Sequence, residues 1–131
     1  MVEWKKTSRR KPSGGINNAV NAKTKTLSEK GGSFSKTIIA KEDKRYKSRT
    51  VGGSEKQKVS HVASVLVSQG NKTKSLKLID VVENKANKHY VRQKVLTKGA
   101  IVKATMDGKE VKVKITSRPG QSGQINGIVV E

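Results

Sequence analysis

The sequence predicts an all-β protein: a small antiparallel β-barrel of about six strands, preceded by an extended, flexible and basic N-terminal arm. From about residue 36, short segments rich in Val and Ile recur between turn residues, a spacing typical of barrels and sandwiches. The apolar residues are also unevenly shared, with 27 in residues 61–131 and 15 in residues 1–60. We therefore divide the 131-residue chain into an arm over residues 1–35 and a barrel domain over residues 36–131.

The arm shows neither the periodicity of a helix nor the alternation of a strand. It is rich in Ser, Thr, Asn and Lys, and it contains the doublets Gly14-Gly15 and Gly31-Gly32. Few of its residues could enter a core, so we expect it to be disordered when free and to become ordered on a partner. A flexible tail without a partner is the alternative.

The first expected strands are short and partly basic. Residues 37–40 form one candidate, and residues 45–51 form another in which Arg45, Lys47 and Arg49 share a face. Residues 59–68 are rich in β-branched side chains, which is typical of a single buried strand. A turn that contains Gly70 is expected to follow.

A long strand is expected over residues 74–83, but its alternation changes halfway. Leu76 and Leu78 point to one side, whereas Ile79 and Val81 point to the other. A change of this kind indicates a β-bulge, or a strand buried on both faces at a barrel corner.

Residues 84–97 break the alternation, so we expect a long loop with one helical turn. Strands over residues 100–105 and 109–117 then flank Asp107-Gly108, a favoured two-residue hairpin turn. In the second of these strands, three apolar residues alternate with Glu and Lys. This pattern predicts one buried face and one charged face.

A loop over residues 118–123 and a last strand over residues 125–130 complete the expected fold. Short strands with little helix predict a barrel or a sandwich. A closed barrel is favoured because closure leaves no exposed strand edges.

The net charge of the chain is +19, from 29 Lys and Arg against 10 Asp and Glu. Repulsion of this size opposes compaction unless a polyanion neutralises it, so nucleic acid and an anionic membrane are the first candidate partners. The sequence contains no Cys, no apolar run long enough to cross a bilayer, and no apolar segment of a signal peptide near the N-terminus. A membrane partner would require an amphipathic helix, and no segment offers one.

Catalytic and metal-binding patterns are missing from the sequence, so we expect no active site, no metal and no cofactor. His61 and His89 are the only histidines, and neither has a potential metal ligand at the usual spacing. Asp80 and Glu83 would lie on opposite faces of a strand and would not converge. Salt bridges with the many Lys residues are the simpler interpretation of the acidic residues.

Two glycine doublets lie next to arginines and are candidate phosphate contacts. Backbone N–H groups of glycines can approach a phosphate closely, and arginine offers a planar fork for two phosphate oxygens. The alternative for each doublet is a plain turn. The candidate residues of these two segments are Arg9, Arg10, Lys11, Gly14 and Gly15 in the arm, and Arg49, Gly52 and Gly53 in the barrel domain.

A third candidate segment follows the long strand. Asn can read base edges or ribose hydroxyls, Tyr and His can stack on unpaired bases, and Lys and Arg neutralise phosphates. Each of these two residues also has an interpretation without RNA. The tyrosine could pack in the core or at the rim of the barrel and hold the loop there, and the histidine could cap a helix or lie on the surface. The candidate residues are Asn84, Asn87, Lys88, His89, Tyr90 and Arg92.

Three segments of the chain resemble a known family. They are VVENKANKHYVR at residues 81–92, LTKGAI at residues 96–101 and TSRPGQ at residues 116–121. They resemble the archaeal and eukaryotic small-subunit ribosomal protein numbered eight in the e-series, which is distinct from the bacterial-type protein with the same number. The arm also resembles the opening of that family, at Trp4, Ser8, Arg10-Lys11 and Gly14-Gly15. The length of the chain is similar to that of the archaeal form.

The resemblance implies a non-catalytic protein of the small ribosomal subunit, with a β-barrel and a basic extension that bind ribosomal RNA. It implies ribosomal RNA and neighbouring ribosomal proteins as partners, and a cytoplasmic location within the subunit; we also expect a monomer when free. The family's RNA contacts are carried over to Arg10, Lys11, Gly14, Gly15, Lys23, Lys25, Gly52, Gly53, Asn84, Asn87, His89, Tyr90, Arg92, Lys98 and Arg118.

The chain departs from the family pattern at a few positions. Lys6 stands where the family usually has Gly, Val51 and Ser54 replace a basic residue and Asn, and residues 16–22 lack the usual arginines. A stand-alone RNA-binding protein or RNA chaperone is the alternative function.

Overall fold

The computed structural model describes residues 3–5, 7–18, 26–70, 72–106 and 108–130. The chain separates into two compact units, Met1–Phe34 and Ser35–Glu131.

In the described part of the first unit, two short antiparallel pairings are present. Strand β1 (Glu3–Trp4) pairs with β2 (Lys30–Gly31), and the 3₁₀ helix η2 (Leu27–Glu29) directly precedes β2. Farther along the chain, Arg10 and Ile16 form an isolated antiparallel bridge across a tight turn. These pairings are too short to produce the alternation by which strands are recognised in a sequence.

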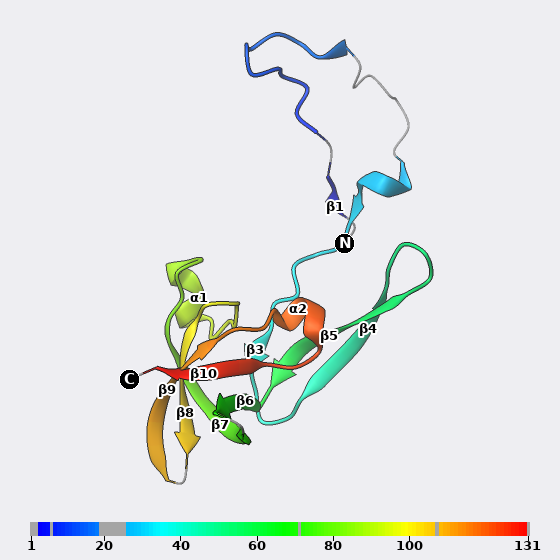
Figure 1. Ribbon diagram of the computed structural model, residues 1–131. Helices are drawn as coiled ribbons and strands as arrows, with labels where there is room; N and C mark the ends of the chain where they lie inside the picture. The colour runs from blue at the N-terminus through cyan, green and yellow to red at the C-terminus, as the bar shows by residue number, and fades with distance from the viewer. Residues whose placement is uncertain (1–2, 6, 19–25, 71, 107, 131) are drawn as a thin grey trace. The chain divides into compact units, whose positions relative to one another are not determined.

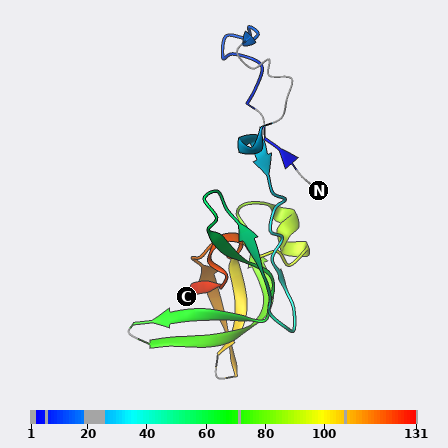
Figure 2. The same ribbon diagram turned by 90° about the vertical axis from the view of Figure 1, so that its right-hand side faces the viewer.

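The second unit contains a closed five-stranded barrel with the strand order β10-β6-β7-β8-β9 (Figure 1). All neighbouring strands are antiparallel except β6 and β10, which run parallel and close the barrel. The hairpin of β6 and β7, drawn in green, is clearest in Figure 2. The all-β barrel predicted from the sequence is confirmed. Its strands are β6 (Ser64–Gln69), β7 (Lys72–Glu83), β8 (Ile101–Met106), β9 (Lys109–Ile115) and β10 (Asn126–Val130).

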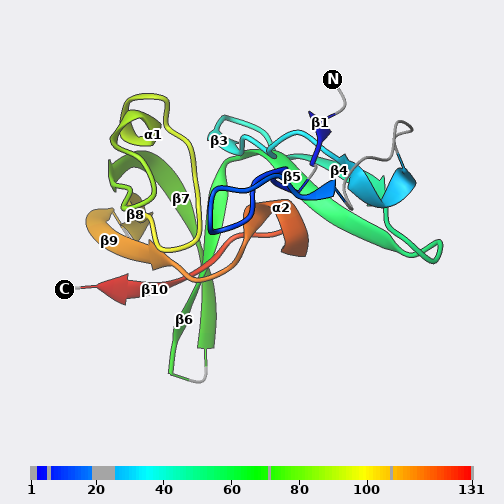
Figure 3. The ribbon, with the colours of Figure 1, turned by 90° about the horizontal axis from the view of Figure 1, so that it is seen from above.

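A three-stranded sheet with the order β3-β5-β4 completes the second unit. Its strands are β3 (Ile38–Ile39), β4 (Lys44–Arg49) and β5 (Glu55–Val62). Figure 3 shows the β4–β5 hairpin extending away from the barrel strands.

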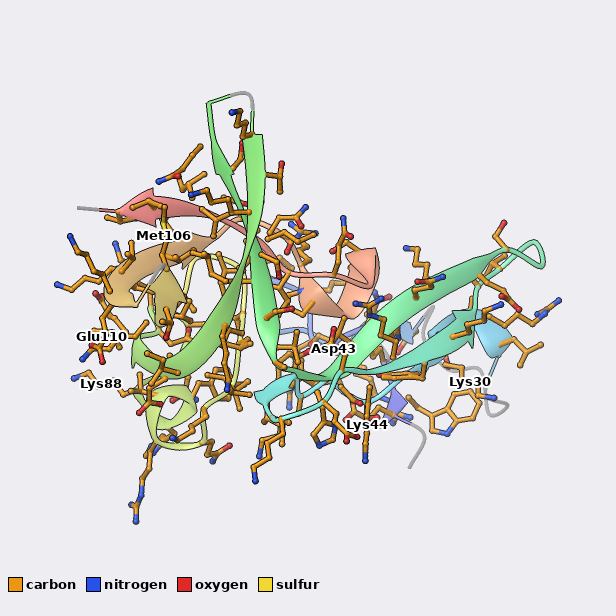
Figure 4. All side chains as sticks on the ribbon, turned by 90° about the horizontal axis from the view of Figure 1, so that it is seen from below. Lys30, Asp43, Lys44, Lys88, Met106 and Glu110 are labelled. Atoms are coloured by element: carbon orange, nitrogen blue, oxygen red, sulfur yellow. The ribbon has the colours of Figure 1, made fainter. Side chains whose placement is uncertain are left out.

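The prediction of one strand over residues 59–68 is wrong, because the chain passes from one sheet to the other at Ala63. The Ala63 N–H donates to Asp43 Oδ1 at 2.8 Å, and the Ala63 carbonyl accepts from the Leu78 N–H at 2.9 Å. Asp43 lies where the three-stranded sheet meets the barrel (Figure 4). Both neighbouring segments are β-branched, so composition does not reveal this change of sheet.

The core consists of Val, Ile, Leu and Ala side chains, as the low aromatic content predicts. The alternation of β9 is confirmed, since Val113 and Ile115 are fully buried while Lys112 and Lys114 are exposed. Gly127 on β10 leaves room inside the barrel for Val113, because a Cβ at Gly127 would lie 2.5 Å from Val113 Cγ1.

Strand β7 contains the expected irregularity, with register shifts between Leu78 and Asp80 and again between Val81 and Glu83. The first shift turns Ile79 outward, where it is 40% exposed. Val81 is 5% exposed and faces the core with the leucines, which corrects the expectation that it shares a side with Ile79. A bulge inserts one extra residue, so the following side chain returns to the original face.

Two short helices connect the later strands. The helical turn expected within residues 84–97 is α1 (Lys88–Arg92). The segment expected as a loop at residues 118–123 contains α2 (Pro119–Ser122), because Pro119 is compatible with the first helical turn and Gly123 ends it at a φ of +67°.

The hairpin expected at residues 100–117 is confirmed, with Met106 opposite Lys109. Of its two turn residues, Asp107 lies outside the described residues and Gly108 has a φ of +83°.

Candidate nucleic-acid interface

The basic segment of the arm folds into a turn that uses part of its own hydrogen-bonding capacity. The Gly14 N–H donates to the Lys11 carbonyl at 2.9 Å, and the Arg10 guanidinium donates to the Gly14 carbonyl at 2.8 Å. The φ of Gly14 is +86°, a conformation that favours glycine. The Gly14 N–H is therefore used within the turn, as the Gly53 N–H is used by its bond to the Thr50 carbonyl at the tip of the β4–β5 hairpin.

The basic side chains of this turn remain exposed. Arg9, Arg10 and Lys11 are all accessible, as is Gly15. Lys23 and Lys25, the other arm residues predicted to contact RNA, lie outside the described residues.

The second glycine doublet lies at the tip of the β4–β5 hairpin. Gly52 and Gly53 have φ values of +86° and +85°, and the Thr50 N–H and Oγ1 both donate to the Ser54 carbonyl, at 2.7 and 2.9 Å. A Cβ at either glycine would meet open space, so the tip is unobstructed and Arg49 stands exposed beside it.

The β4–β5 hairpin carries an excess of positive charge. Asp43 forms an ion pair with Arg45 at 3.0 Å, and Glu55 forms one with Lys47 at 3.1 Å. Both pairs are exposed and contribute little to stability. The hairpin's basic residues outnumber these two carboxylates and are Lys44, Arg45, Lys47, Arg49, Lys56 and Lys58.

Asn84 has a structural position. It is 5% exposed, its Nδ2 donates to the Val95 carbonyl at 3.3 Å, and its Oδ1 accepts from the Ala86 N–H and the Thr97 hydroxyl, both at 3.0 Å. These hydrogen bonds fix the loop around α1. Both the amide nitrogen and the amide oxygen of Asn84 take part in them, so this buried side chain is not available to contact a base. We therefore leave Asn84 out of the proposed RNA surface.

Asn87 caps α1, since its Oδ1 accepts from the His89 N–H at 2.9 Å. At the other end, Lys94 adopts a φ of +54° and its ammonium lies 3.4 Å from Asp80 Oδ1. The turn of helix between them exposes Lys88, His89 and Arg92.

The remaining predicted contacts occupy different settings. Tyr90 is half-buried, as expected for an aromatic side chain at the rim of the barrel. Lys98 and Arg118 are exposed, in the connections that follow α1 and β9. Figure 4 shows the labelled Lys88 side chain on the outside of α1.

The barrel adds three basic residues that the sequence did not single out as contacts. On its outer face, Lys103 of β8 lies directly opposite Lys112 of β9, and Lys114 is the next outward residue. Lys103 contacts Glu110 at 3.4 Å. Like charges placed opposite each other destabilise a sheet, and Glu110 offsets part of this repulsion. The sequence shows the alternation within each strand. It does not show the register between β8 and β9, which places Lys103 opposite Lys112.

The acidic residues form no metal centre within the described part of the chain. Asp80 pairs with Lys103 and Glu83 with Ile101, so the second shift in β7 puts both carboxylates on the outer side. The expectation that they occupy opposite faces is therefore wrong. Asp80 is bound to Lys94, and within the described ranges no three His, Cys, Asp or Glu residues are grouped to hold a metal.

Among the helices formed by the described residues, none has the length and apolar character to cross a bilayer.

Replacing Asn84 with Ala is expected to lower the free energy of unfolding by about 3 kcal/mol, because it leaves buried polar groups without partners. Urea denaturation would measure the change. The matched variant Asn87→Ala removes only a helix cap and should cost about 1 kcal/mol. Equal, small effects of the two changes would contradict the structural role of Asn84.

Comparison with known proteins extends over nearly the whole chain. Residues 4–130 match the model of the family described as ribosomal protein S8e. The chain is 36% identical over 132 residues to the small ribosomal subunit protein eS8 of Methanosarcina barkeri, covering 99% of this chain and 100% of that one. It is 39% identical over 132 residues to the protein of the same name from Methanococcus aeolicus, covering 99% and 98%.

These relatives are named as components of a ribosome, which confirms the prediction that the chain is not an enzyme. The family resemblance noted in the arm and in residues 81–121 is likewise confirmed by a match that spans both units. The chain belongs to the ribosomal protein S8e family.

Proposed function

We propose that this chain is a structural constituent of the small ribosomal subunit and that it binds ribosomal RNA, supporting subunit assembly and translation. The observation that carries the proposal is the similarity along the whole chain to proteins named as small-subunit components. The net charge of +19 supports RNA as the main partner, because phosphates neutralise the repulsion between exposed Lys and Arg residues.

Three groups of exposed cations are suited to this role. They are the turn of the arm, the β4–β5 hairpin, and the surface formed by α1 and the outer lysines of β8 and β9. The hydrogen-bonded barrel supplies a rigid platform. Recognition would depend on RNA shape, phosphates and 2′-hydroxyls rather than on a base sequence alone.

The residues that we propose as RNA contacts combine those selected from the sequence and the barrel lysines. Asn84 and Asn87 support local structure through their side-chain hydrogen bonds and are left out. The proposed contacts are Arg9, Arg10, Lys11, Gly14, Gly15, Lys23, Lys25, Arg49, Gly52, Gly53, Lys88, His89, Tyr90, Arg92, Lys98, Lys103, Lys112, Lys114 and Arg118.

Sedimentation tests the proposed location. The tagged full chain, expressed in cells of an organism that has this family, should sediment with the small subunit and stay there after a wash in high salt. Free chain should behave as a monomer, and the bound chain should follow the cytoplasmic ribosomes. Release of the whole population by the wash, together with binding to many unrelated RNAs, would instead favour an RNA chaperone.

A further inference from the structure

A cavity of about 420 Å³ lies between the end of β7 and α1. Its volume falls within the range of about 300–1,000 Å³ that is usual for small-ligand pockets. Its lining combines apolar, cationic, amide and carboxylate side chains. The lining residues are Val82, Glu83, Asn84, Lys85, Ala86, Asn87, Lys88 and Val91.

The second bulge of β7 creates this combination. In a regular strand, Val82 and Glu83 would point to opposite faces. The register shift between Val81 and Glu83 makes Val82 the extra residue, so Val82 and Glu83 are both exposed and both line the cavity. Bulges commonly redirect side chains in this way beside functional sites.

The carboxylate of Glu83 has no cationic partner among the described residues. Asp43, Glu55, Asp80 and Glu110 each form an ion pair, whereas Glu83, like the exposed Glu42, forms none with a described residue; unlike Glu42, Glu83 lines the cavity. An unpaired carboxylate on an RNA-binding surface repels phosphates. It becomes favourable where it accepts hydrogen bonds from the N–H groups of a base.

We propose that this cavity binds one unpaired guanine nucleotide of RNA, an inference that rests on the proposed function. Val82, Ala86 and Val91 supply apolar contacts for the flat base. The two oxygens of Glu83 accept from guanine N1–H and N2–H, which are adjacent donors on its Watson–Crick edge. Adenine, cytosine and uracil each present donors from only one nitrogen on that edge, so they cannot form the same pair of bonds.

Two lysines provide the charge that holds the nucleotide's backbone. Lys85 and Lys88 line the cavity and are exposed, so their ammonium groups can reach the flanking phosphates. Lysine acts there as a mobile point charge that does not distinguish bases. The site therefore divides its tasks: the lysines give affinity for any RNA, and Glu83 gives the preference for guanine.

The test uses the full chain and short uridine oligoribonucleotides that carry a single central guanosine, adenosine or cytidine. Fluorescence anisotropy at low salt should show tighter binding of the guanosine oligonucleotide by about tenfold or more. Amide resonances of Val82, Ala86 and Val91 should shift most with that oligonucleotide in ¹⁵N-edited NMR spectra.

Glu83→Gln gives the sharpest comparison. The variant should lose the preference for guanosine while binding the other oligonucleotides as tightly as before or more tightly, because a negative charge is removed. Glu42→Gln is the matched control, since Glu42 is exposed and is not among the residues that line the cavity. It should keep the preference, and the spectra would show that both variants remain folded.

Equal binding of all the oligonucleotides, no binding of any of them, or an unchanged preference in Glu83→Gln would overturn the guanine site. If the chain nevertheless binds small-subunit ribosomal RNA and sediments with the subunit, only this inference fails. If the chain also fails to bind ribosomal RNA, the proposed function fails with it.

Discussion

Binding of the full chain to small-subunit ribosomal RNA is expected to weaken by about a thousandfold or more when monovalent salt rises from about 50 to about 200 mM. The chain has 29 Lys and Arg residues, and the described Arg9, Arg10 and Lys11 are exposed. Each contact with a phosphate releases a condensed counterion, so affinity falls steeply with salt. Filter binding across a salt series would measure the slope, and a slope near zero would refute this mechanism.

The outer lysines of the barrel should carry part of this slope. A variant with Lys103, Lys112 and Lys114 all changed to Gln should bind more weakly, with a slope reduced by about 0.7–0.9 for each phosphate that the protein no longer neutralises. The matched variant with Arg at the same three positions keeps the charge and should keep the slope. Identical slopes for the Gln and Arg variants would exclude this face from the RNA interface.

Deletion of residues 1–35 is expected to have a separate effect in the same assay. Weaker binding and a shallower slope would show that the arm contacts RNA. An unchanged slope would mean that the arm contacts a protein neighbour or nothing, and that the barrel unit carries recognition. Circular dichroism of the shortened chain would establish that its strands still form.

Gly127→Ala is expected to lower the free energy of unfolding by about 2–3 kcal/mol, because it forces atoms into a packed barrel. The added Cβ would lie 2.5 Å from Val113 Cγ1 and 3.0 Å from the Lys114 carbonyl oxygen. The backbone of β9 cannot move away without breaking its pairing with β10. Urea denaturation, monitored by far-ultraviolet circular dichroism, would measure the loss.

Gly32→Ala is the control for this variant. A Cβ at Gly32 would meet open space, and Gly32 belongs to the first unit, so the change should leave the stability of the barrel unaltered. Equal stability of the two variants would contradict the close approach of β9 and β10 at Gly127.

Regular strands with one buried face could be predicted from the sequence. In β9, Val113 and Ile115 alternate with Lys112 and Lys114, and the structure buries the first two and exposes the others. The prediction failed at residues 59–68, where two strands of different sheets adjoin with a single residue between them. Val-rich composition is the same on both sides of Ala63, and only pairing partners distinguish the strands.

The candidate site was predictable in its residue types but not in their orientation. The cationic and polar residues after β7 were found from composition. Asn84 is buried and hydrogen-bonded, whereas its neighbours in the chain are exposed. The sequence could not show this difference, because an irregular segment has no periodicity from which burial can be predicted. The sequence analysis did not select Glu83 as a contact, because the side to which it points depends on a bulge that alternation does not predict.

The charge, the all-β class, the hairpin at residues 100–117 and the family all follow from the amino-acid sequence alone. The three-dimensional fold was needed to show that β6 and β10 run parallel, that Lys103 faces Lys112, and that Val82 and Glu83 share a cavity. The physical reason is that charge and alternation are local properties. Register depends on strands far apart in the chain, and a single inserted residue reverses which side chains face outward.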